Sequence, residues 1–198
     1  MKIVELILDE EQEESGIEAI SIVESPAIES DFVALKAEEI KLAEVDTDKR
    51  ILLGALLIPN KPIYRTGEEG DYYIFFSKDT IVKASQMYLK NGYQNNSTLE
   101  HEKALNGLTL VESWIVEDEV QDKSRKYGLD VPVGTWMGAV KVNNEEIWQK
   151  YVKGNLVKGF SIEGYFADKM ERPKEDIKED LSEDDIILNE IKNILTSN

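Results

Sequence analysis

The sequence predicts an α+β fold that is mainly β, and three observations support this. Short runs rich in β-branched and aromatic residues recur between Gly, Pro and Asn turns. Two segments between these runs, 77–92 and 144–154, have apolar residues at helical spacing. Apolar residues make up 41% of the 198 residues, enough for one packed core. We therefore expect one domain over 1–167, with N-terminal strands in 1–36 and a β core in 50–167, followed by an acidic tail over 168–198.

Strands are expected wherever a short apolar or β-branched run ends at a turn signal. The run at 17–23 ends before Pro26, because proline removes a donor from the ladder. The run at 50–59 is apolar on both faces and should be a buried strand, and 72–76 is rich in aromatic residues. The full set of expected strands is 1–7, 17–23, 32–35, 50–59, 72–76, 108–117, 134–142 and 161–166.

Two helices are expected between these strands. Ser77 offers an N-cap, and the apolar residues that follow have helical spacing up to Asn91-Gly92, where glycine suits a left-handed cap. Asn144 offers a second start, with two glutamates in the first turn, and Gly154 ends that helix. The segment 168–198 has ten acidic and five basic residues and ends in the pattern of an amphipathic helix. We expect it to be a tail or a partner-binding helix.

Composition excludes several classes of function. The net charge of −17 argues against nucleic acid as a partner, because the overall field repels phosphates. The absence of cysteine excludes disulfides, thiolate metal sites and cysteine nucleophiles. No segment has the roughly 20 apolar residues of a membrane helix, and the N-terminus lacks the apolar run of a signal peptide.

One serine lies between two glycines in the run Lys158-Gly-Phe-Ser-Ile-Glu-Gly164, and His101 is the one histidine of the chain. A serine nucleophile needs a base, so His101 is the one imidazole that could activate Ser161. The run is not a nucleophile elbow, because the second glycine follows the serine by three positions rather than two. A serine beside glycine is also common in turns, and a single histidine is common on surfaces, so local chemistry leaves both interpretations open.

Two glutamates, Glu112 and Glu163, can likewise be interpreted either as catalytic groups or as ordinary surface residues. Glu112 lies in an apolar strand and needs a partner if it is buried, but it could equally form a solvated ion pair with a lysine. Glu163 follows Ser161 by two positions and is a similar case. The sequence pattern around them leaves a catalytic role and a surface role open for each.

The order of several segments resembles that of phage serine proteases encoded in the capsid operons of tailed phages and defective prophages. The match spans roughly residues 15–167. The segments that carry it are Ile20–Ala27, Leu53–Arg65, Glu100–Glu102, Val111–Val116, Val131–Met137 and Lys158–Gly164. The chain is thus similar to prohead, or capsid maturation, proteases, which share a fold with herpesvirus assemblins.

The resemblance implies a herpesvirus-protease-like β-barrel flanked by helices, with the barrel core in 50–167. It implies that Ser161 is the nucleophile and His101 the general base. Herpesvirus enzymes use a second histidine, which this chain lacks, so a carboxylate or a dyad must replace it. We expect Glu112 in this role, with Glu163 as the alternative. Oxyanion donors would be backbone N–H groups within residues 154–164.

The function implied is a serine endopeptidase that cleaves scaffold and capsid-protein segments, and then itself, during prohead maturation. It would act in the prohead interior, in the host cytoplasm, with the scaffold and the major capsid protein as partners and self-association as a further contact. Neither a cofactor nor a metal is needed for this chemistry, and neither nucleic acid nor membrane is an expected partner. The alternatives are a catalytically silent structural protein of the same fold and a small acidic binding module.

Overall fold

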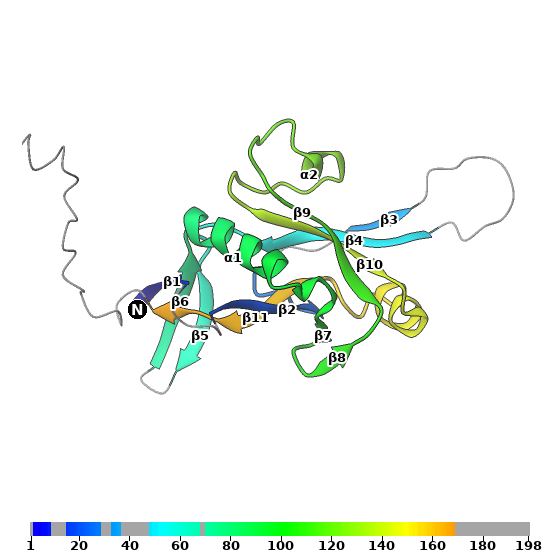
Figure 1. The fold of residues 1–198 in the computed structure, drawn as a ribbon, viewed down its shortest axis with the longest axis horizontal. Coiled ribbons are helices and arrows are strands. Elements are labelled where there is room, and N and C mark those ends of the chain that lie inside the picture. Colours follow the sequence, from blue (N-terminus) through cyan, green and yellow to red (C-terminus); the bar gives the residue numbers. More distant parts are fainter. Residues whose placement is uncertain (1, 9–14, 29–32, 37–47, 68–69, 169–198) are drawn as a thin grey trace, which may run out of the picture.

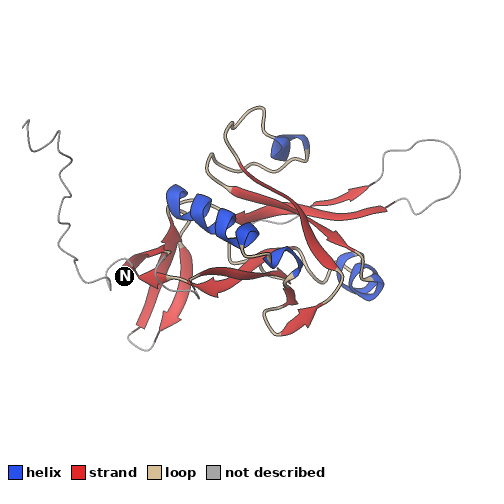
Figure 2. Ribbon diagram, viewed as in Figure 1, coloured by secondary structure: helices blue, strands red, loops and turns tan. Residues whose placement is uncertain are grey.

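The computed structural model describes residues 2–8, 15–28, 33–36, 48–67 and 70–168. Its strands form three four-stranded sheets (Figures 1 and 2). The first sheet has the order β12 (Ala167–Asp168), β1 (Lys2–Ile7), β6 (Gly70–Phe76) and β5 (Ile63–Gly67). The second sheet has the order β3 (Val33–Lys36), β4 (Asp48–Leu57), β10 (Trp136–Val142) and β9 (Leu108–Ile115). The third sheet has the order β11 (Gly159–Tyr165), β2 (Gly16–Val23), β7 (Ser97–Leu99) and β8 (Lys103–Leu105).

The helical segments are short apart from the first. They are α1 (Lys78–Lys90), a 3₁₀ turn at Tyr93–Asn95, α2 (Lys123–Lys126) and a π-helix at Ile147–Val152. Helix α1 begins as expected, since the Ser77 side chain accepts a hydrogen bond from the Thr80 N–H. Gly92 follows with a φ of 77°, the left-handed cap that the sequence predicts.

The core is continuous and contains the strand that the sequence marks as buried. Leu52, Leu53 and Leu56 of β4 are fully buried, because β4 is covered on both faces. Helix α1 packs on the second sheet through Tyr88, whose ring meets that of Trp136 edge to face at 5.7 Å. This packing fixes the second sheet against the rest of the domain.

The mainly β prediction is confirmed, and each of the eight expected strands has a counterpart in the structure. The described strands form three open sheets and no closed barrel, so the barrel that the resemblance implies is not seen in this part of the chain. Four strands were not expected, β5, β7, β8 and β12, and neither was α2. The segment after Asn144 is a π-helix rather than an α-helix, with Lys153 N–H donating to the Trp148 carbonyl five residues back.

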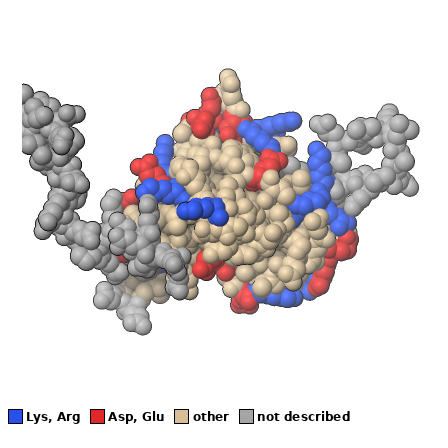
Figure 3. All heavy atoms as spheres, in the orientation of Figure 1, with Lys and Arg blue, Asp and Glu red and all other residues tan. Residues whose placement is uncertain are grey.

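Some expectations lie outside the described residues. They include the structure of residues 169–198, with the expected C-terminal helix. On the face drawn in Figure 3, acidic and basic side chains are interspersed around neutral surface rather than separated by sign.

Candidate active site

Ser161 lies on the strand β11, which forms an edge of the third sheet. Its cross-strand partner on β2 is Ser21, and Ser21 in turn is paired with Thr98 of β7. Three hydroxyl-bearing residues therefore stand in one row across the sheet. Ser21 is fully buried, whereas Ser161 is partly exposed and accessible to a ligand.

Glu163 follows Ser161 on the same strand by two positions. Alternation along a strand puts both side chains on one face of the sheet, with their α-carbons about 6.8 Å apart. This spacing is set by the strand itself, so the hydroxyl and the carboxylate are held in a fixed relation. A third group between them could contact both.

His101 lies in the tight loop that joins β7 to β8. Glu100 and His101 both have positive φ angles, of 51° and 61°, a conformation uncommon for residues other than glycine. The His101 N–H donates to the Ser21 Oγ at 3.0 Å, and the Glu102 N–H donates to the Leu99 carbonyl. A buried serine therefore holds the backbone of His101 in a strained turn, as is common at functional sites.

The His101 ring is directed to Glu163. Its Nδ1 lies 3.2 Å from Glu163 Oε1, and the side chains are 42% and 30% exposed. The Thr98 hydroxyl donates to the same carboxylate oxygen. Such a carboxylate favours the tautomer that carries the proton on Nδ1, which leaves Nε2 free as a base. Among the described residues no hydrogen bond joins His101 to Ser161.

The structure places Glu112 elsewhere. Glu112 lies on β9 in the second sheet, opposite Ala139, and forms an ion pair with Lys123. Both side chains of this pair are well exposed, at 46% and 37%. Of the two glutamates considered from the sequence, the alternative, Glu163, is therefore the one that contacts His101, and Glu112 has the solvated lysine partner.

Gly164 has a structural role just beyond the serine. The register between β11 and β2 shifts after Glu163, so that Glu18 is the extra residue of a bulge. A β-carbon at Gly164 would lie 2.0 Å from the Gly16 carbonyl oxygen. The second glycine of the Ser161 segment is thus required by the close approach of two strands.

Ser21 and Thr98 were not singled out from the sequence. Ser21 interrupts an apolar strand in Ile20-Ser21-Ile22, and a buried hydroxyl in such a position needs a partner. That signal could have marked Ser21 as unusual. Thr98 gave no comparable signal, because its contact with Glu163 depends on which strands are neighbours.

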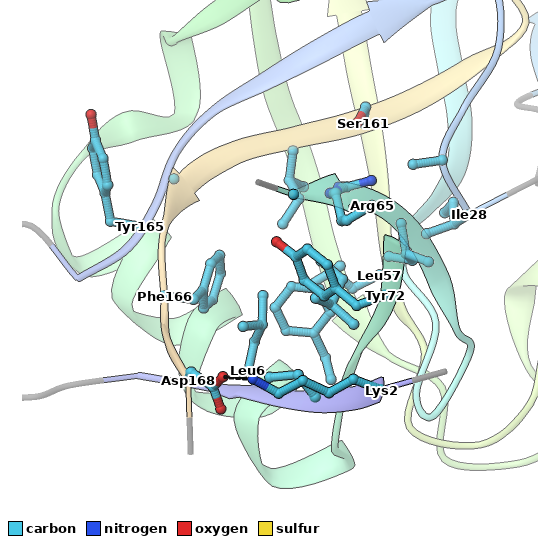
Figure 4. Close-up of a pocket in the computed structure, with 18 of the residues that line it drawn as sticks. Lys2, Leu6, Ile28, Leu57, Arg65, Tyr72, Ser161, Tyr165, Phe166 and Asp168 are labelled. Carbon is cyan, nitrogen blue, oxygen red and sulfur yellow. Dashed lines mark ion pairs between the residues drawn. The ribbon is translucent and has the colours of Figure 1, made fainter. Parts of the chain in front are cut away.

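A cavity of about 660 Å³ adjoins Ser161 (Figure 4). Strand β11 forms one wall, and the first sheet forms the opposite wall. No group of three or more metal-ligating side chains gathers in the described ranges. Within the same ranges, every helix is too short or too polar to cross a lipid bilayer.

Comparison with known proteins places these features in a family. No curated protein matches the chain significantly, and no solved structure does. A family model described as "Putative phage serine protease XkdF" matches residues 39–171, which is more than half of the chain and includes His101, Ser161 and Glu163. The chain therefore belongs to this phage serine protease family.

Proposed function

We propose that the chain is a serine endopeptidase of phage prohead maturation, with Ser161 as nucleophile, His101 as general base and Glu163 as the group that orients the base. The observation that carries this proposal is the contact between His101 Nδ1 and Glu163 Oε1 on the sheet face shared with Ser161. Membership of a phage serine protease family supports the same assignment.

The chemistry is acyl transfer. His101 Nε2 takes the Ser161 hydroxyl proton while Oγ attacks the carbonyl carbon of the scissile peptide bond. The imidazolium that forms keeps its Nδ1 proton against Glu163, whose negative charge stabilises it. His101 then protonates the leaving amine, and water, activated by the same ring, hydrolyses the acyl-enzyme. The ring approaches Ser161 by side-chain rotation, since catalytic hydrogen bonds often tighten when substrate binds.

Glu163 replaces Glu112 in this proposal for a geometric reason. One oxygen of the Glu163 carboxylate contacts both His101 Nδ1 and the Thr98 hydroxyl, so the carboxylate is oriented before substrate binds. Glu112 lies on a different sheet, where it forms an ion pair with Lys123. An orienting carboxylate must contact the imidazole itself.

The proposed substrates are segments of the scaffold and the major capsid protein, and the chain itself, in the prohead interior. The support for this part is the phage origin of the family. A protease confined with its substrates meets them at high local concentration, so modest affinity suffices.

The test is co-expression with the neighbouring scaffold and capsid proteins, read by the masses of the products. We expect cleavage with the natural chain and none with Ser161→Ala. Cleavage by Ser161→Ala at the natural rate would refute a serine mechanism. If neither chain cleaves any of the proteins or itself, the catalytically silent structural role is the correct one.

A matched pair of variants tests the carboxylate. Glu163→Gln should lower kcat by about 10²- to 10⁴-fold, because the amide no longer stabilises the imidazolium. Glu112→Gln makes the same chemical change at a solvated ion pair and should leave kcat within about twofold. The reverse ranking of the two variants would assign the orienting role to Glu112.

A further inference from the structure

The cavity beside Ser161 lies between two sheets. Its upper wall in Figure 4 is β11 with Ser161, and at its other end Lys2 and Asp168 form an ion pair at 3.7 Å. At about 660 Å³ the cavity is within the size range of ligand-binding sites. It is therefore large enough to accept a bulky side chain of a bound peptide.

The deep wall of the cavity is apolar. Leu57, Ile63, Ile74 and Phe76 line it and are almost fully buried in the domain core. Phe166 also lines it and packs edge to face on Phe76, with ring centroids 4.8 Å apart. An apolar group entering the cavity exchanges water for hydrocarbon and aromatic contacts.

Four charged residues also line the cavity: Lys2, Arg65, Asp71 and Asp168. Arg65 is exposed on the edge strand β5, and its guanidinium donates to the Tyr64 carbonyl at 3.0 Å. Lys2 and Asp168 neutralise one another. Tyr72 also lines the cavity with its phenol (Figure 4), so a polar side chain that does not reach this hydroxyl or the charged residues would be buried against the apolar wall at a cost.

We infer that this cavity is a specificity subsite that takes one bulky apolar side chain, aromatic or branched aliphatic, of the substrate near the bond attacked by Ser161. The inference rests on the proposed function, since it takes the bound peptide to be the substrate. It follows from the continuity of the cavity with Ser161 and from its apolar wall. Selection between large and small apolar residues by such pockets is commonly tenfold or more.

The first experiment digests a peptide mixture of diverse sequence with the natural chain and maps the residues around each cut by mass spectrometry. We expect one position near the cut to be enriched in Phe, Leu, Ile, Tyr or Met. Cuts with no enrichment of bulky apolar residues at any position would overturn the inference while leaving the serine protease proposal intact.

A filling variant tests whether the cavity is responsible. Ala27 lines the cavity from a partly exposed position at the border of the core, so Ala27→Trp places a large ring in the cavity, and circular dichroism must show that the variant is folded. Val120 is 81% exposed outside the cavity, and Val120→Trp is the matched control. Ala27→Trp should reduce the preference for bulky over small residues at least about tenfold, and Val120→Trp should retain it. Retention of the preference in a folded Ala27→Trp would overturn the inference.

A ligand-binding experiment distinguishes failure of this inference from failure of the proposed function. If the natural chain cleaves nothing, the protease proposal fails and the cavity is judged by ligand binding alone. The probes are N-acetyl-phenylalanine amide and N-acetyl-serine amide, titrated into Ser161→Ala and followed by NMR chemical shifts. Binding of the phenylalanine probe at least about tenfold more tightly, and its loss in Ala27→Trp, would support the subsite. Equal binding of the two probes would overturn it.

Discussion

Replacing Ser21 by alanine tests whether the third sheet holds in place the loop that carries His101, the proposed base. The Ser21 hydroxyl is fully buried and accepts the His101 N–H at 3.0 Å. Alanine removes the acceptor of this part-buried hydrogen bond, and the net loss of such a bond is about 0.5–1.5 kcal/mol. With a urea m-value of about 2 kcal/mol/M, the unfolding midpoint should fall by about 0.3–0.8 M.

Activity should fall further than stability alone explains. His101 keeps its positive φ while Ser21 fixes its backbone, so the alanine variant lets the loop between β7 and β8 relax. A displacement of a catalytic group by about 1 Å can lower the rate about 10²-fold. We expect kcat/KM to fall by about 10- to 100-fold at a temperature at which the variant is folded by circular dichroism.

Ser85→Ala is the matched control. Ser85 is also buried, and its hydroxyl donates to the Val82 carbonyl at 2.8 Å within α1. Alanine is the better helix former, so this variant should lose little stability and keep full activity. If Ser21→Ala has the urea midpoint and kcat/KM of the control, the role assigned to Ser21 is wrong.

Three further changes have defined outcomes. Gly164→Ala should lower stability by at least about 2 kcal/mol, because the added β-carbon would overlap the Gly16 carbonyl oxygen. Calorimetry should show a Tm lower by several degrees, and an unchanged Tm would exclude the tight bulge. Thr98→Val should lower kcat about tenfold and alter the pH profile of kcat, because Glu163 loses a hydroxyl donor; an identical profile would mean that Thr98 does not act through Glu163. Burial raises the pKa of Tyr88 far above its usual value, so the folded state retains a proton that the unfolded state loses above about pH 10. Stability should fall as pH rises past that value, and less steeply in Tyr88→Phe, as urea midpoints at pH 9 and 11 would measure; equal slopes would contradict the burial of this phenol.

Sequence patterns predicted the elements whose signals are local. Helix α1 has a serine cap, helical spacing and a closing glycine, and β4 has a continuous apolar run between turn signals. The strands β7 and β8 have three residues each, which is too short a run for alternation of apolar and polar residues to mark a strand. Strand β5 is exposed along most of its length, so it too has no alternation of apolar and polar residues that would mark a strand.

The site was predictable in part. Ser161 and Glu163 share a face by alternation alone, a relation that the sequence contains. The partner of His101 depends on β2 lying between β11 and β7, with β7 parallel to it. Parallel pairing of strands far apart in the chain has no local signature, so the contact of Glu163 rather than Glu112 with His101 could not be predicted without the fold.

The division of the site between one strand and one hairpin loop has a practical consequence. Ser161 and Glu163 are fixed to each other by covalent geometry on β11, so folding has one distance left to set, that from His101 to this strand. Shortening or replacing the loop at residues 100–102 would remove the proposed base while leaving the proposed nucleophile and the adjoining cavity in place. Such a chain would be an inert trap for substrates, and its captured peptides would report specificity without turnover.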